Sequence, residues 1–103
     1  MSLKIMSYLL DAMDKRKEVR RGNGKVVISG DGTALLYHYS TAIYRVDVDG
    51  KRYICLDWLS VSTVRRLNCI SGVNLSTRGG NVILNGVGQM QPEAGSWWVQ
   101  LPY

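Results

Sequence analysis

Two adjacent arginines follow a pair of hydroxyl residues in the stretch STVRRLNCISG, which begins at Ser62. Ser62 and Thr63 supply hydroxyl groups, and Arg65 and Arg66 supply planar, permanently charged donors. Near a helix start, free backbone N–H groups would add to this set, and the combination suits a phosphate or a carboxylate. The alternative is a solvated helix face whose arginines pair with nearby aspartates. This segment is the strongest candidate binding site in the sequence.

A basic run, KRKEVRRGNGK, is the second candidate. Such a run can lie along a nucleic-acid backbone, and its affinity then falls steeply as salt rises. The alternative is a solubilising helix end that faces water. The net charge of +5 and pI near 9.5 permit attraction to nucleic acid and argue against an acidic mimic of DNA. The run holds six of the thirteen lysines and arginines: Lys15, Arg16, Lys17, Arg20, Arg21 and Lys25.

The large aromatic residues are all tyrosine or tryptophan, with no phenylalanine. Each of these side chains has a polar group on a large ring, which suits a binding surface or a stacking platform. Half-buried sheet residues are the alternative. Trp97 and Trp98 are adjacent, so in a strand they point to opposite faces, and we expect at least one of them to need a covering partner. The exposed edge of that terminal strand also predicts a homodimer.

The sequence contains no recognisable catalytic or metal-binding pattern. His38 is the single histidine, and we predict a structural role for it because no cysteine pair accompanies it. No Ser-His-Asp set, paired carboxylate or phosphate-binding glycine loop can be assembled. Cys69 is predicted to share a face with the two arginines, which would lower its pKa; a buried, inert thiol is the alternative. We therefore expect a protein that is not an enzyme and takes no cofactor or metal.

Targeting and membrane-spanning segments are not evident. The apolar residues after Met6 are interrupted at Asp11, well short of the roughly 20 residues that a membrane span requires. Two cysteines do not make the disulfide framework of a small secreted protein. The expectation is one domain over residues 1–103, in a reducing cytoplasm, with no membrane partner.

The elements that must position these residues follow from apolar periodicity. Residues 3–20 have helical spacing and predict an amphipathic helix that ends near Gly22. The segments KVVIS, TALLYHY, TAIYRVDV and KRYICLDWL predict a four-stranded antiparallel meander. The Asp49–Gly50 pair predicts a two-residue type I′ turn between the last two strands. Alternation along the third strand places Tyr44 on one face and Ile43 with Arg45 on the other.

A short second helix is predicted to begin with Ser60 or Ser62 as its N-cap. Its period turns Val61, Val64 and Leu67 toward the core, and the arginines away from it. Two final segments, NVILN and SWWVQL, predict a terminal β-hairpin. The fold class is therefore α+β: an N-terminal helix, a meander, a short helix and a terminal hairpin.

The stretch from Leu36 to Ile70 loosely resembles a core found in small uncharacterised phage- and plasmid-encoded proteins. In that core a strand with Tyr-Ser/Thr-x-Ile leads to a hairpin and then to a Ser-x-Ser/Thr-Thr-x-Arg helix. Ser62 and Thr63 match the hydroxyl pair, and Arg65 matches the basic position. The resemblance implies an origin on a mobile element in a bacterial host, where such proteins regulate genes or block host defences. It implies no particular ligand.

Two functions are consistent with these features. The first is an accessory or regulatory protein that binds nucleic acid, or a nucleic-acid-handling complex, through its basic residues. The second is an anti-defence inhibitor, similar in kind to an anti-CRISPR protein, that docks on a host protein complex. Tyrosine, tryptophan and arginine dominate interface hot spots, which favours the second function.

Overall fold

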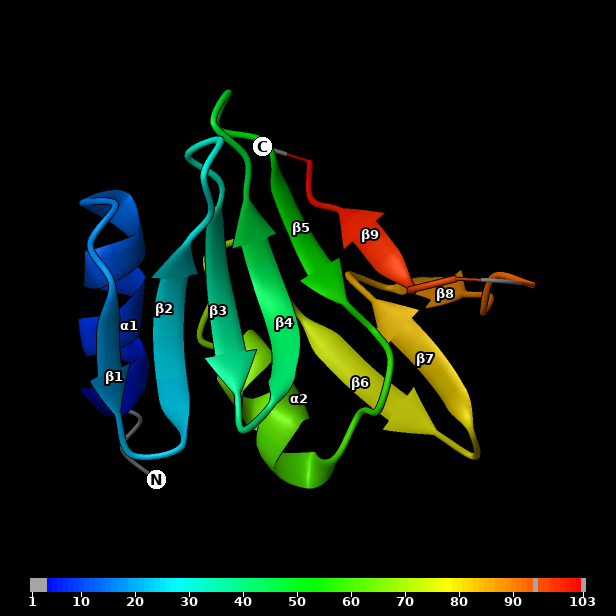
Figure 1. The fold of residues 1–103 in the computed structure, drawn as a ribbon. Coiled ribbons are helices and arrows are strands. Elements are labelled where there is room, and N and C mark those ends of the chain that lie inside the picture. The colour runs from blue at the N-terminus through cyan, green and yellow to red at the C-terminus, as the bar shows by residue number, and fades with distance from the viewer. Residues whose placement is uncertain (1–3, 94, 103) are drawn as a thin grey trace.

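The computed structural model describes residues 4–93 and 95–102, which form an α+β fold with two helices and two antiparallel sheets (Figure 1). The larger sheet has six strands in the order β1-β2-β3-β4-β5-β9. The strands are β1 (Val19–Arg21), β2 (Gly24–Ile28), β3 (Ala34–His38), β4 (Thr41–Val46), β5 (Arg52–Cys55) and β9 (Trp98–Gln100). The predicted meander is thus confirmed as β2 to β5. The edge strand β1 was not predicted.

Helix α1 (Lys4–Asp14) is amphipathic, as its periodicity predicts, but it ends earlier than residue 20. Arg16 has a φ of 53°, and the N–H groups of Arg16 and Lys17 donate to the carbonyls of Met13 and Ala12. These two bonds form a Schellman motif, so Arg16 and not Gly22 stops the helix. Gly22 instead lies in the β1–β2 turn.

The Asp49–Gly50 turn differs from the prediction in its type. Gly50 has a φ of 89°, whereas Asp49 is not among the residues with positive φ. A type I′ turn requires positive φ at both central positions, so this turn is of another type. The N–H of Gly50 donates to the carbonyl of Asp47, and the N–H of Asp47 donates to the carbonyl of Lys51. The loop therefore closes as a longer turn with glycine in the left-handed position.

Strand β4 contains a bulge that the sequence pattern did not predict. Leu36 pairs with Tyr44, but Tyr37 pairs with Ala42, so the register shifts between these two positions. One extra residue, Ile43, is accommodated, and both Ile43 and Tyr44 are buried. The expectation that Ile43 lies on the same face as Arg45 is therefore wrong.

Helix α2 (Val61–Leu67) begins after Ser60, whose hydroxyl accepts the N–H of Thr63 at 3.2 Å. Ser60 is thus the N-cap, one of the two residues predicted. Leu67 is buried as expected, but Val61 is 72% exposed, so the expectation that Val61 faces the core is wrong.

The C-terminal region forms no hairpin between the two predicted segments. NVILN lies in the middle strand of a separate three-stranded sheet, whereas the tryptophan segment pairs with β5 in the larger sheet. Pairing of β9 with β5 joins residues far apart in sequence, which local turn signals do not predict. The smaller sheet comprises β6 (Leu75–Arg78), β7 (Asn81–Leu84) and β8 (Val87–Gln89).

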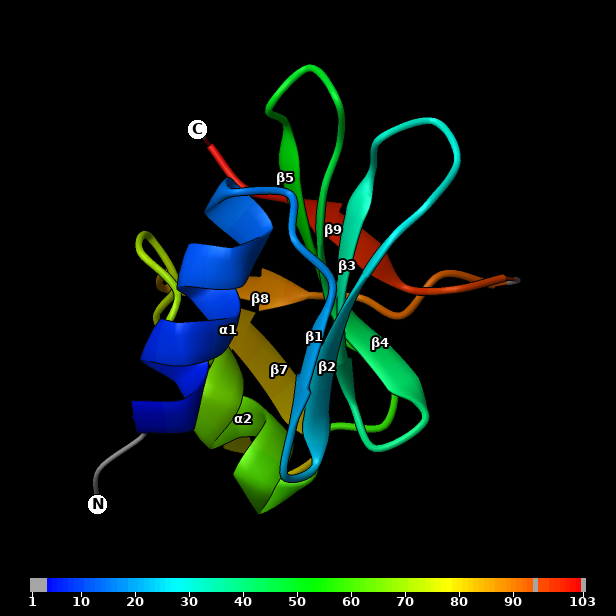
Figure 2. The same ribbon diagram turned by 60° about the vertical axis from the view of Figure 1, so that its left-hand side comes forward.

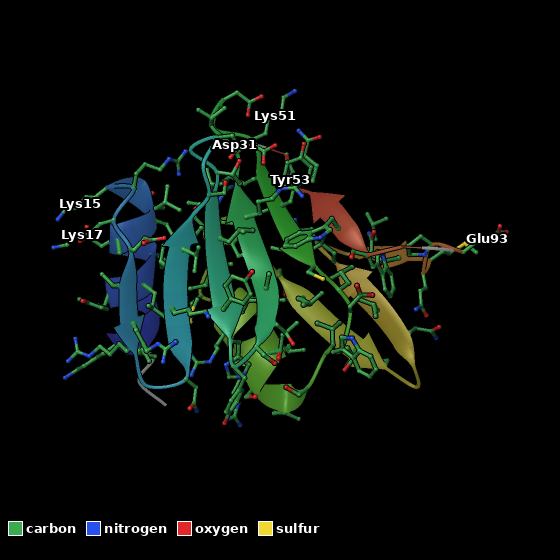
Figure 3. All side chains as sticks on the ribbon, viewed as in Figure 1. Lys15, Lys17, Asp31, Lys51, Tyr53 and Glu93 are labelled. Carbon is green, nitrogen blue, oxygen red and sulfur yellow. The ribbon has the colours of Figure 1, made fainter. Side chains whose placement is uncertain are left out.

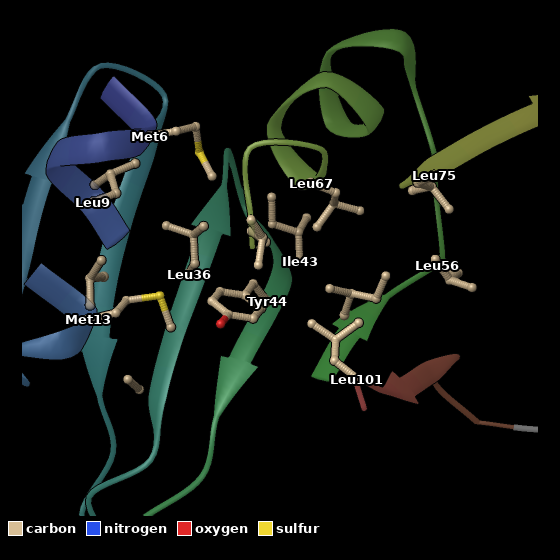
Figure 4. Packing of buried hydrophobic residues seen from close by; sticks show 14 of the residues in the cluster. Met6, Leu9, Met13, Leu36, Ile43, Tyr44, Leu56, Leu67, Leu75 and Leu101 are labelled. Atoms are coloured by element: carbon tan, nitrogen blue, oxygen red, sulfur yellow. The ribbon is translucent and has the colours of Figure 1, made fainter. Parts of the chain in front are cut away.

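The core lies on one face of the six-stranded sheet, here called the inner face. Helices α1 and α2 and the smaller sheet all lie on this side (Figure 2). Side chains from every layer meet there, and each buried leucine or methionine contributes roughly 1.5–3 kcal/mol by leaving water (Figure 4). They include Met6, Leu9, Met13, Leu36, Ile43, Leu67, Leu75 and Leu101. No described helix or strand covers the opposite, outer face, which faces the viewer in Figure 1.

No helix in the described ranges has both the length and the apolar character that crossing a bilayer demands.

Candidate functional site

The first half of the outer face is a basic and aromatic row across three strands. Arg20 of β1 lies directly opposite Lys25 of β2, and Lys25 lies opposite Tyr37 of β3. The Lys25 ammonium is 4.9 Å from the centre of the Tyr37 ring, a cation–π contact. Within the described ranges neither Arg20 nor Lys25 has a carboxylate partner. Two cations thus lie side by side on the β1 side of a half-buried ring.

The second half is a stack built around Arg45 of β4. Its guanidinium carbon lies 4.0 Å from the ring centre of Tyr53 and 5.0 Å from that of Trp98. Arg45 Nε is 3.0 Å from Asp47 Oδ1, and both side chains are less than a third exposed. Strand β4 pairs with β5, and β5 pairs with β9, so the three side chains come together on one face. The Arg45–Asp47 ion pair lacks hydrogen-bond geometry, because Nε has no hydrogen-bond partner among the residues that the structure describes. The guanidinium therefore keeps donor capacity for an anion.

Beyond the stack the face opens into a hollow of about 430 Å³ at the end of β5. Tyr37, Trp58 and Trp98 contribute rings to its lining, and Asp57 contributes a carboxylate. Trp58 is 85% exposed and has a φ of 55°, an uncommon backbone conformation for a bulky residue. Residues in such sparsely populated backbone conformations cluster at functional sites.

The predicted basic run does not form one surface. Only Arg20 and Lys25 lie on the outer face. Lys15 forms an ion pair with Asp11 at 3.0 Å. Arg16, at the end of α1, donates from its guanidinium to the backbone carbonyl of Asp47, just after β4. Arg21 faces the α1 side, with its guanidinium 4.9 Å from the ring centre of Tyr8. In Figure 3, Lys15 and Lys17 project past the α1 end of the molecule, away from the sheet. The run divides because its first three residues follow the end of α1, whereas β1 turns Arg20 and Arg21 to opposite faces.

The predicted STVRR site lies on the helix side and is only partly accessible. Thr63 is buried, and its hydroxyl is 3.0 Å from Ser60 Oγ, so it is not available to a ligand. Ser62 and Arg65 are exposed. Arg66 is half-buried, with Nη1 3.9 Å from Met6 Sδ, which corrects the expectation that both arginines point away from the core. The N–H groups of Thr63 and Val64 are already bonded to Ser60, so little of the helix start remains for an anion.

A buried histidine supports this helix. His38 Nε2 is 3.1 Å from Ser62 Oγ, and Nδ1 has no partner within the described ranges. Burial lowers the pKa of His38 below its usual value, and the nearby positive charge of Arg66 adds to this effect. A serine–histidine pair can in principle perform nucleophilic chemistry. In the described ranges, however, no acid orients Nδ1, which leaves the dyad without the third group of a triad.

The two cysteines are free thiols. Cys69 is exposed, so it is not the buried thiol of one expectation. Its pKa is raised by desolvation, which outweighs the lowering effect of Arg66, so the expected thiolate is wrong as well. Cys55 is buried at the hollow, where burial also raises its pKa.

Trp97 and Trp98 occupy opposite faces, as adjacency in a strand predicts. Trp97 packs against the core, and its backbone N–H donates to Asp57 Oδ2 at 2.9 Å. Trp98 lies on the outer face against Arg45. Arg45, Tyr53 and Trp58 were not predicted as site residues. Strand alternation, which separates Arg45 and Tyr53 from the core positions, was the signal that could have found the first two.

No group of three or more His, Cys, Asp and Glu side chains that could hold a metal occurs in residues 4–93 and 95–102. No family model, curated protein or solved structure matches the chain.

Proposed function

We propose that this protein is a non-enzymatic binding protein that holds single-stranded nucleic acid on the outer face of its six-stranded sheet. The observation that carries the proposal is the contact of the Arg45 guanidinium with the rings of both Tyr53 and Trp98, on a face that no described element covers. Rings offer bases a stacking platform, and neighbouring cations attract the phosphates.

The charge distribution supports an anionic ligand. Arg20, Lys25 and Arg45 lie across the same face, and only Arg45 has a carboxylate partner among the described residues. The net charge of +5 attracts a polyanion at long range. A protein surface that displays both rings and unpaired cations fits nucleic acid better than it fits a neutral ligand.

A single strand fits this face better than a duplex does. Bases in a duplex are stacked on one another and cannot lie against Tyr53 or Trp98. Both helices pack on the inner face, so neither projects from the outer face into a groove (Figure 2). Six strands span about 24 Å, enough for several nucleotides.

Fluorescence anisotropy with a labelled oligothymidine of about twelve nucleotides tests the proposal. The double variant Arg20→Ala/Lys25→Ala removes two charges from the outer face. Lys15→Ala/Lys17→Ala removes two charges elsewhere and is the matched control. We expect the first to weaken binding about tenfold and to flatten the salt dependence, and the second to leave both nearly unchanged.

Trp98→Ala tests the stacking component separately. Loss of one stacked base costs about 1–3 kcal/mol, so we expect affinity to fall by at least about fivefold with the salt dependence unchanged. Equal weakening by both double variants would show only nonspecific charge attraction. Absence of binding to any oligonucleotide at low salt, with a host protein retained from lysate after nuclease treatment, would overturn the proposal in favour of a protein-binding inhibitor.

A further inference from the structure

The hollow at the end of β5 has features that stacking and charge attraction do not require. Its volume of about 430 Å³ lies within the range of small-molecule sites. Tyr37, Trp58 and Trp98 line it together with one carboxylate, that of Asp57. A carboxylate is unexpected on a face that otherwise attracts phosphates. The hollow therefore needs a separate explanation.

Asp57 is held firmly in position. Its Oδ2 accepts a hydrogen bond from the backbone N–H of Trp97 at 2.9 Å, and Cys55 Sγ lies 3.6 Å from the same oxygen. The N–H of Leu56 donates to the carbonyl of Trp97 at 2.8 Å, which ties this strand end to the segment before β9. Oδ1 has no donor among the residues that the structure describes. The carboxylate thus offers a fixed oxygen to whatever occupies the hollow.

Building on the proposed function, we propose that the hollow holds one guanine base of the bound strand. The rings supply stacking surfaces, and the Asp57 carboxylate accepts from the ring N1–H and the exocyclic N2 amino group of guanine. A carboxylate has acceptor capacity for both donors in addition to the N–H of Trp97.

The hydrogen-bonding edges of the other bases fit a carboxylate less well. Adenine and cytosine each place an acceptor nitrogen beside their amino group, and that nitrogen would face a negatively charged oxygen. Thymine and uracil place carbonyl oxygens on both sides of their single N–H. Guanine alone presents two adjacent donors, so Asp57 discriminates in its favour by attraction and against the others by repulsion.

The test compares three oligonucleotides: oligothymidine, the same strand with one central guanine, and the same strand with one central inosine. Inosine keeps N1–H but lacks the N2 amino group. We expect wild-type protein to bind the guanine strand about tenfold more tightly than oligothymidine, with inosine between them. Guanosine monophosphate alone is a fourth ligand in this test. If it binds saturably but does not change the affinity of the protein for the guanine strand, the hollow is a site for a free nucleotide and the proposal is wrong.

Asp57→Asn is the decisive variant, because asparagine keeps an oxygen for the N–H of Trp97 while losing the charge. We expect the guanine preference to vanish, because affinity for the guanine strand falls while oligothymidine affinity stays constant or rises with the loss of the repelling charge. Asp49→Asn is the matched control: Asp49 Oδ1 also accepts a backbone N–H, from Lys51 at 3.0 Å, but it lies in an exposed turn. It should retain the full preference.

Trp58→Ala keeps the proposal falsifiable if Asp57→Asn fails to fold, since its indole is largely exposed. We expect this variant to lower affinity for the guanine strand more than for oligothymidine. Wild-type binding without guanine preference, or a preference that survives in Asp57→Asn, would overturn the base assignment and leave strand binding intact. Failure to bind any strand would overturn both proposals.

Discussion

The two faces of the six-stranded sheet come from alternate residues of the same strands, and they have opposite chemistry. On β3, Ala34, Leu36 and His38 are buried on the inner face, whereas Leu35 and Tyr37 are half-exposed on the outer face. The inner face is closed by helices and a second sheet. The outer face keeps rings and cations in contact with one another and with water. The residues that form the core and the residues of the candidate binding surface are thus one position apart along the strand.

Neighbouring leucines provide the largest expected difference. Leu36 is 1% exposed and packs in the core, whereas Leu35 is half-exposed on the outer face. Leu36→Ala leaves a cavity and should lower the free energy of unfolding by about 2–5 kcal/mol. Leu35→Ala should lower it by less than about 1 kcal/mol. Urea denaturation of both variants measures the difference, and equal losses would mean that the outer face is also a core.

His38 gives a smaller, pH-dependent effect on the inner face. Its folded-state pKa lies below the usual 6.5, because burial disfavours the charged imidazole. Above pH 6.5 the full stability is present, and it declines as pH falls further, since the unfolded chain then binds a proton that the folded chain resists.

Chemical denaturation between about pH 8 and pH 5 should show this decline in the wild type. His38→Gln removes the titrating group and should flatten that part of the profile. A decline that is the same in both proteins would assign it to other groups.

The smallest effect belongs to a turn outside both faces. The pKa of Asp31 is lowered to about 2, mainly by the hydrogen bond from the Ser29 hydroxyl and then by that from the Thr33 N–H. Folding favours the charged carboxylate, so Asp31 stabilises the folded state above its unfolded pKa of 3.8. This stabilisation is lost as pH falls toward the folded pKa of about 2. Titration of the carboxyl by NMR should show the low midpoint, and Ser29→Ala should raise it. An unchanged midpoint would exclude the hydroxyl as its cause.

Local patterns were sufficient to predict most of the inner architecture. Apolar spacing predicted α1 and the meander, and the hydroxyl of Ser60 marked the start of α2. Strand β1 was not predicted because Val19–Arg21 contains two arginines that continue a basic helical run in the sequence. The pairing of β9 with β5 was not predicted because it depends on tertiary contacts between distant segments.

The candidate site was predicted only in part. Arg20, Lys25 and Trp98 were named from composition and adjacency, and the structure places all three on the outer face. Thr63 was named as well, but capping by Ser60 turns its side chain inward, which a sequence motif does not reveal. Trp58 was missed because its exposure depends on a left-handed backbone, for which a tryptophan in the sequence gives no signal.

The bulge in β4 also affects how this chain tolerates changes in length. In a regular strand, deletion of one residue exchanges every later side chain between the two faces. Here the extra residue is already present, and deletion of Ile43 would restore the one-to-one pairing of Ala42 with Tyr37 and Tyr44 with Leu36. The core would lose one side chain, but each remaining residue of β4 would keep its face. Evolution can therefore shorten this strand by one residue without exchanging the outer face for the face that packs in the core.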